Sequence, residues 1–75
     1  DVRLAALLVE EMEITGESML KMTHEEIAHH LGTAREVITR MLKYFQKEQL
    51  VSLSRGSIEI IDEDRLYELA KDSRR

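Results

Sequence analysis

The sequence contains no cysteine and no proline, and only three of its 75 residues are glycine. Without cysteine, the chain cannot hold a disulfide framework, a cysteine-bound zinc ion or a thiol nucleophile. Its longest uninterrupted apolar run covers residues 4–9, which is far too short to span a membrane. No signal peptide is visible either. These absences exclude several classes of secreted, membrane-spanning and thiol-dependent protein.

The length allows one small domain, which we assign to residues 1–75. Hydrophobic residues make up 43 % and charged residues 35 % of the sequence, a composition typical of a folded chain rather than a disordered one. The first residue is Asp1 rather than methionine, and we expect the chain to be part of a longer protein.

The net charge of −4 is unevenly distributed along the sequence. Residues 1–20 carry one basic and five acidic residues, whereas residues 21–50 carry five basic and four acidic residues. The middle third is therefore mildly basic although the whole chain is acidic. Nucleic-acid binding depends on which face holds the charge, and the net value does not reveal this.

Apolar periodicity predicts a first helix over residues 2–12 and a loop or small hairpin around residues 14–22. Two capping-box patterns, at residues 23–26 and 33–36, predict the starts of two further helices on either side of Gly32. The second of these helices is expected to run to about Gln49. Two helices joined at a glycine with almost no linker indicate a helix-turn-helix over residues 23–49.

The apolar period changes from 3.6 to 2 after Leu50. Alternation on both sides of Arg55-Gly56 predicts a β-hairpin wing over residues 50–61, and Asp62 then begins a short helix over residues 63–71. The predicted fold class is mainly α with a small β-hairpin wing, that is, a winged helix-turn-helix.

The outer face of the third helix offers side chains that could read DNA. Arg35 lies in its first turn, and a helical wheel sets the remaining polar residues opposite the apolar stripe, namely Glu36, Thr39, Arg40, Lys43 and Lys47. Arginine can bond guanine through O6 and N7, and glutamate can accept from cytosine N4. A purely structural interpretation is also open, in which Glu36 completes a helix cap and forms a surface ion pair with Arg40.

The string Thr-His-Glu-Glu-Ile-Ala-His-His-Leu-Gly-Thr-Ala-Arg-Glu-Val-Ile-Thr-Arg-Met-Leu-Lys-Tyr-Phe at 23–45 closely resembles the DNA-binding domain of the Crp/Fnr family of bacterial transcription regulators. Segments 1–8 and 55–62 are similar to its first helix and its wing. The resemblance implies that Arg35, Glu36 and Arg40 read bases, with Thr39 as a weaker base-reading residue. Phosphate contacts are expected from the helix starts, the wing and the outer face of the third helix, at Thr23, His24, Ala34, Lys43, Ser54 and Arg55.

The resemblance also implies a function: sequence-specific DNA binding that regulates transcription, as the C-terminal domain of an effector-responsive regulator in the bacterial cytoplasm. Its partner would be near-palindromic operator DNA with G·C-containing half-sites of the TGTGA type. The parent protein would dimerise through a helix outside this chain, so we expect the isolated domain to be monomeric. RNA polymerase is an additional candidate partner. No cofactor, enzymatic activity or membrane association is expected of this chain.

Other interpretations remain open at this point. The domain could be a winged helix from another regulator family, or one used for protein–protein contact, which the acidic net charge favours. A metal site is not expected, because none of His24, His29 and His30 has a histidine partner four residues away and no cysteine is present.

Overall fold

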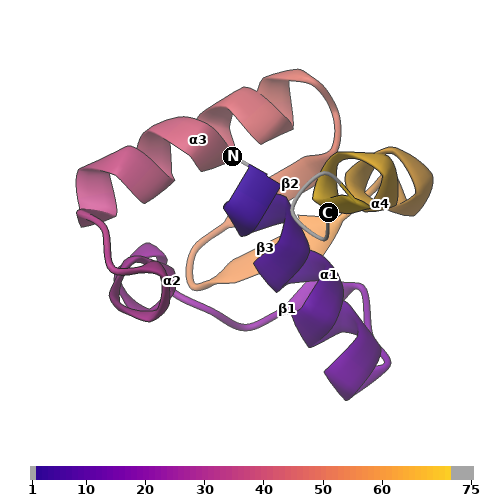
Figure 1. Ribbon diagram of the computed structural model, residues 1–75, viewed down its shortest axis with the longest axis horizontal. Coiled ribbons are helices and arrows are strands. Elements are labelled where there is room, and N and C mark those ends of the chain that lie inside the picture. Colours follow the sequence, from indigo (N-terminus) through magenta and orange to yellow (C-terminus); the bar gives the residue numbers. More distant parts are fainter. Residues whose placement is uncertain (1, 72–75) are drawn as a thin grey trace.

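The computed structural model describes residues 2–71, in which four helices and three short strands form a body of 25 × 25 × 24 Å (Figure 1). The assignment of one domain to residues 1–75 therefore extends beyond the described residues at both ends. The helices are α1 (Val2–Thr15), α2 (His24–Leu31), α3 (Arg35–Lys47) and α4 (Glu63–Lys71). The strands are β1 (Met19–Leu20), β2 (Val51–Ser54) and β3 (Ser57–Ile60).

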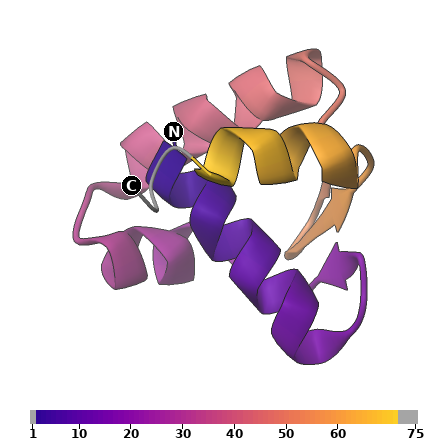
Figure 2. The ribbon, with the colours of Figure 1, turned by 45° about the vertical axis from the view of Figure 1, so that its right-hand side comes forward.

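Helix pairs enclose a single aliphatic core around one aromatic side chain. The α1 helix packs mainly against α4, and α2 packs against α3 (Figure 2). Every helix and strand contributes buried apolar residues, and Phe45 of α3 is the largest side chain that is fully buried. Among the described residues, no helix is both long enough and apolar enough to cross a membrane.

The start of α2 forms the predicted capping box. The Thr23 hydroxyl accepts a hydrogen bond of 3.0 Å from the Glu26 backbone N–H, and the Glu26 carboxylate accepts one of 2.9 Å from the Thr23 N–H. Met22 packs against the core just before this cap, while Ile27 is fully buried within it. These contacts explain why α2 begins at His24.

The α2 helix ends in a Schellman motif at Gly32, which adopts a left-handed φ of 69°. The Thr33 N–H donates to the Ala28 carbonyl at 2.9 Å, and the Gly32 N–H donates to the His29 carbonyl at 3.3 Å. The predicted role of Gly32 in closing this helix is confirmed.

The second predicted capping box, at residues 33–36, is wrong. Ala34 is the N-cap residue of α3, and no side chain caps this helix. Thr33 precedes the N-cap of α3 by one residue, and its backbone N–H already donates to the Ala28 carbonyl in the motif that closes α2. Glu36 therefore occupies the second position of the helix and has no capping role.

The C-terminal end of α3 also differs from expectation, since the helix stops at Lys47 rather than near Gln49. Gln49 adopts a left-handed φ of 61°, and the Leu50 N–H donates to the Phe45 carbonyl at 2.9 Å. This is a second Schellman motif, formed here without a glycine. The turn reverses the chain and brings β2 back along α3.

The wing is the predicted hairpin, and it belongs to a three-stranded antiparallel sheet in the order β1-β3-β2. Val51 pairs with Ile60 and Ser54 with Ser57 across the two-residue turn. The prediction for residues 14–22 missed two features: α1 continues to Thr15, and β1 pairs with β3 instead of forming a local hairpin. Leu20 is buried opposite Ile58 in this pairing, which anchors the segment to the core.

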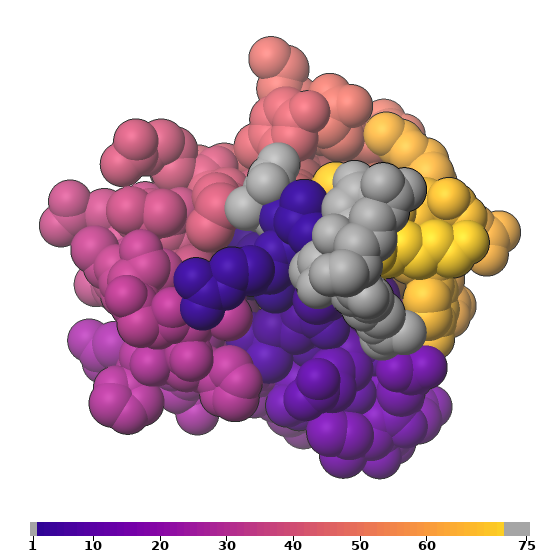
Figure 3. All heavy atoms as spheres, in the orientation of Figure 1, coloured from indigo at the N-terminus to yellow at the C-terminus, as the bar shows by residue number. Residues whose placement is uncertain are grey.

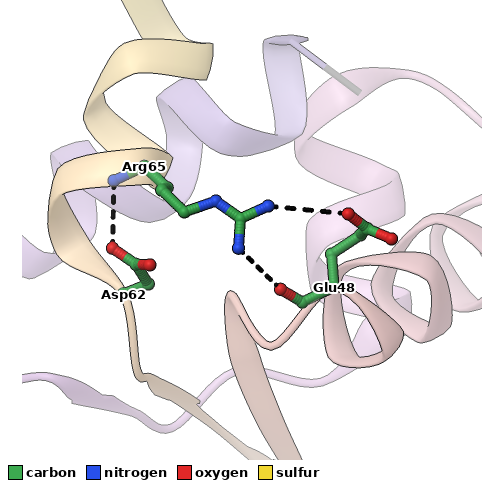
Figure 4. Close-up of polar contacts among 3 residues, drawn as sticks. All are labelled: Glu48, Asp62 and Arg65. Atoms are coloured by element: carbon green, nitrogen blue, oxygen red, sulfur yellow. Dashed lines mark hydrogen bonds and ion pairs between the residues drawn. The ribbon is translucent and has the colours of Figure 1, made fainter.

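Arg65 ties α4 to the end of α3 (Figure 4). Its guanidinium donates to the Glu48 carbonyl at 2.9 Å and lies 3.5 Å from the Glu48 carboxylate. Its backbone N–H donates to the Asp62 carboxylate at 3.1 Å, which confirms Asp62 as the N-cap of α4. One residue thus joins the start of α4 to the turn that leads into the wing.

The left-handed conformation of Gln49 leads to a stability prediction. A side chain in this region of backbone space is strained, whereas glycine adopts it freely. We expect Gln49→Gly to raise the free energy of unfolding by about 1 kcal/mol. Urea denaturation followed by circular dichroism measures the change. Gln49→Ala, which keeps the strain, serves as the control, and an equal gain in both variants would contradict this explanation.

Candidate nucleic-acid interface

The residues predicted to contact DNA come from three elements that meet on one side of the molecule. A depression of about 380 Å³ lies between the start of α2, the start of α3 and the tip of the wing. It is lined by Met22, Thr23, His24, Glu25, Arg35, Ser54, Arg55 and Gly56. In the space-filling view, α2 and the first turns of α3 form the side of the molecule opposite α4 (Figure 3).

Arg35 lies at the centre of this arrangement. It lines the first depression and also a second one of about 380 Å³, which it shares with Glu36 and Thr39. Arg35 and Glu36 are exposed, and Thr39 is half-buried. The structure thus brings three of the four predicted base-reading residues together at the start of α3.

Arg40 lies apart from these three. It lines a separate and mainly apolar hollow of about 400 Å³ with Val37, Met41 and Tyr44. Among the described residues, ion pairs join Arg65 to Glu48 and Lys71 to Glu68, and none joins Glu36 to Arg40. The structural interpretation of Glu36 and Arg40 as an ion pair is therefore wrong, and both side chains are exposed.

His24 contacts a predicted base-reading residue. Its ring nitrogen Nδ1 lies 2.8 Å from the Thr39 hydroxyl oxygen, so the first residue of α2 is hydrogen-bonded to the middle of α3. Partial burial lowers the pKa of the His24 imidazole below its usual value, and the positive charges of Arg35 and Lys43 lower it further. The neutral form of the ring is therefore favoured at pH 7.

Thr23 uses both its backbone and its side chain in the cap of α2. Its oxygen accepts the Glu26 N–H, and its hydroxyl proton is shared with the Glu26 carboxylate, so a phosphate would compete with that carboxylate for it. Hydrogen bonds from the backbone and side chain of Thr23 hold the pKa of the Glu26 carboxyl below its usual range. The cap therefore remains intact in mildly acidic solution.

Ala34 can contribute only its backbone. Because no side chain caps α3, the N–H groups of its first two residues, Arg35 and Glu36, are available to an anion at the positive end of the helix dipole, whereas the Val37 N–H donates to the Ala34 carbonyl at 3.0 Å. Lys43 is exposed one turn after Thr39, and Ser54 and Arg55 are exposed at the wing tip. Five of the six predicted phosphate contacts therefore lie around the start of α3, and Lys43 lies about two turns further along the helix.

The structure adds residues that sequence reasoning did not assign to the interface. Glu25 and Met22 line the first depression, and Tyr44, at 54 % exposure, lines the hollow beside Arg40. Tyr44 follows Arg40 by four residues, and this helical spacing could have identified it. Glu25 carried no comparable signal, because its side-chain direction depends on how α2 packs against α3.

The described part of the chain holds no group of three or more histidine, aspartate or glutamate side chains that could bind a metal ion. Apart from Glu25 and Glu36, the polar residues that line the two depressions are arginine, threonine, serine and histidine. Such side chains recognise phosphate oxygens and base edges by hydrogen bonding and charge.

Residues 2–69 match the family model of the Crp-like helix-turn-helix domain. The chain is 33 % identical to the transcriptional regulator SdrP of Thermus thermophilus in an alignment that covers 92 % of this chain and 37 % of that protein.

Two solved structures share the fold. A protein described as a transcriptional regulator of the crp/fnr family from Eubacterium rectale is 58 % identical, with a TM-score of 0.91 over 93 % of this chain and 32 % of its own. The catabolite activator protein of Thermus thermophilus is 28 % identical, with a TM-score of 0.88 over 95 % of this chain and 33 % of its own. The chain thus spans about a third of the length of these relatives.

The lowered pKa of His24 leads to a prediction about acid stability. The neutral ring is favoured in the folded state, so this contribution to stability is present above the unfolded-state pKa, about 6.5, and is lost as the pH falls through the folded-state value. We expect the free energy of unfolding to decrease more between pH 7 and pH 5 in the native chain than in His24→Asn. Urea titrations at both pH values measure the difference, with His29→Gln as the control. Equal decreases in all three proteins would contradict the assignment.

Proposed function

The chain belongs to the family of Crp-like helix-turn-helix domains, and on that premise we propose that α3 enters the major groove of operator DNA while the wing lies on the adjacent backbone. The family and the relatives are those of DNA-binding transcription regulation, not of enzymes. The observation that carries the proposal is the depression in which the starts of α2 and α3 meet the wing tip, with Arg35 and Arg55 both lining it.

Base reading is assigned to Arg35, Glu36 and Arg40, with a smaller contribution from Thr39. The arginines would donate to guanine O6 and N7, and Glu36 would accept from cytosine N4. The exposure of all three charged side chains supports this assignment, as does the absence of an ion pair among them in the described structure. Arg40 lines a different hollow from Arg35 and Glu36, so it would reach a different base pair of the same half-site.

Phosphate contacts are assigned to groups around the start of α3 and to Lys43 further along the same helix. The hydroxyls of Thr23 and Ser54, the backbone N–H of Ala34 and the cations Lys43 and Arg55 are suited to phosphate oxygens. His24 faces the same depression. Contacts from two helix starts and a wing would set the angle at which α3 enters the groove.

The parent protein is proposed to be an effector-responsive regulator in the bacterial cytoplasm. This chain accounts for about a third of its relatives' length, so sensing and dimerisation would lie outside it. The dimer would bind a near-palindromic operator with G·C-containing half-sites about 10–10.5 bp apart, and RNA polymerase would be its further partner. The isolated domain would be a monomer that binds one half-site weakly and needs no cofactor.

Arg55 at the wing tip tests the phosphate contacts. We expect Arg55→Ala to weaken binding to all duplexes alike, and to lower the slope of log affinity against log salt by about one unit. Fluorescence anisotropy across a salt series measures both effects. Lys71→Ala removes the same charge from α4, on the far side of the molecule, and is expected to leave the slope unchanged. Binding that does not depend on salt would favour a protein partner over DNA.

Glu36 and Arg40 test the base readers. Glu36→Ala is expected to abolish discrimination at one base pair and to lower the free energy of unfolding by at most about 1 kcal/mol, because Glu36 acts on stability only through the helix dipole and neither caps α3 nor forms an ion pair in the described structure. Arg40→Ala is expected to cost about 1–3 kcal/mol of discrimination at another base pair. A base-substitution scan of the half-site, together with thermal denaturation, measures these effects. Glu10→Ala on α1 is the control for the loss of an acid. Unchanged base preference in both variants would contradict the assignment.

A further inference from the structure

The contact between His24 and Thr39 connects two parts of the interface that have different tasks. His24 is the first residue of α2 and lines the depression with Arg55, on the side assigned to phosphate contacts. Thr39 lies in α3 and lines the second depression with Arg35 and Glu36, on the side assigned to base reading. Their side chains meet at 2.8 Å, although the residues are 15 positions apart in the sequence.

The chemistry of this pair is directional. A hydroxyl has one proton to donate, and its oxygen accepts through two lone pairs. If Nδ1 carries no proton, it accepts the Thr39 hydroxyl proton, and the Thr39 oxygen then offers only lone pairs to a base. If Nδ1 carries a proton, it donates to the Thr39 oxygen, and the hydroxyl proton is free to point toward a base. The protonation of one ring nitrogen therefore determines whether Thr39 acts as acceptor or donor.

From this contact we propose that His24 is a positioning residue that sets the hydrogen-bonding polarity of Thr39 and thereby the base that Thr39 prefers. The inference rests on the proposed DNA-binding function of the same face. With a neutral His24 whose Nε2–H donates to a phosphate, Nδ1 is an acceptor and Thr39 accepts from the amino group of cytosine or adenine. With a protonated His24, Thr39 donates to the oxygen or N7 of guanine, or to the oxygen of thymine.

The charged groups around His24 make the protonation of its ring dependent on pH and on bound DNA. Arg35 and Lys43 face it from α3, Arg55 shares its depression from the wing, and Glu25 is its neighbour on α2. The positive charges favour the neutral ring in the free domain, as does the helix N-terminus where His24 lies. A DNA phosphate beside the ring would oppose them and favour protonation as the pH falls.

The experiment begins with the 75-residue chain and a pool of duplexes of randomised sequence, selected at pH 8.0 to define the half-site. Thr39→Val, which keeps the shape of the side chain but removes the hydroxyl, identifies the base pair that Thr39 reads. At that position a C·G pair is then inverted to G·C, which exchanges donor and acceptor at one point of the groove. Fluorescence anisotropy compares the two duplexes at pH 8.0 and pH 5.0.

We expect the native chain to favour the duplex that offers the amino group by about fivefold at pH 8.0, the value of one hydrogen bond. This preference is expected to disappear or reverse at pH 5.0. In His24→Asn the side-chain amide takes the position of Nδ1 without titrating, so the preference is expected to be the same at both pH values. The control His29→Gln/His30→Gln, which removes the other two histidines, is expected to behave like the native chain.

Several outcomes would overturn the proposal. A base preference that is unchanged between pH 8.0 and pH 5.0 in the native chain would refute it while leaving DNA recognition intact. A pH dependence that persists in His24→Asn would assign the effect to another group. Selection that yields no preferred sequence would instead contradict the proposed function itself. As a second readout, the ring-nitrogen chemical shifts of His24 in the complex at pH 8.0 are expected to report an unprotonated Nδ1, and circular dichroism verifies that each variant is folded.

Discussion

The backbone turn at Gly32 is the constraint on which the rest of the interface depends. Only three residues separate the last residue of α2 from the first residue of α3. The left-handed φ of Gly32 allows Thr33 to close α2 while Ala34 begins α3. With both helices packed on the same core, this short joint determines where the start of α2 lies along α3. That placement brings His24 within hydrogen-bonding distance of Thr39 and opens the depression that Arg35 and Arg55 share.

The acidic net charge is compatible with a DNA-binding face because of where the acids lie. Glu13, Glu17 and Glu63 line a separate depression between the end of α1, the turn after it and α4, whereas α2 and the start of α3 occupy the side opposite α4 (Figure 3). The domain is about 25 Å across, and the Debye length in 0.1 M salt is about 10 Å. Charges on the far side are thus largely screened from a duplex, while Arg35, Lys43 and Arg55 would lie against it, with Glu25 and Glu36 as acids among them.

The sequence predicted those features whose causes are local. The Thr23 cap, the closure at Gly32, the hairpin turn and the start of α4 each depend on a few adjacent residues, and each was predicted correctly. The cap at Thr33 failed because two local patterns competed for one backbone N–H, and the closing motif of α2 used it. The β1 strand was missed because two residues carry no periodicity, and their partners in β3 are about 40 positions away. The base-reading and phosphate assignments came from the helical wheel of the third helix and from family resemblance, and they remain predictions.

The contact between His24 and Thr39 illustrates what sequence reasoning about an interface leaves out. Each residue was assigned a role by its place on its own helix, one toward phosphate and the other toward bases. Because the two side chains share a hydrogen bond, these roles are coupled. When the neutral ring carries its proton on Nε2, where it can bond a phosphate, Nδ1 can only accept a hydrogen bond from Thr39. Arg35, Glu36 and Arg40 are exposed and have no ion-pair partner in the described structure, so charge alone fixes what they can bind. Thr39 is neutral and can either donate or accept, so its preference must be set by a neighbour, and His24 is the neighbour that the fold supplies.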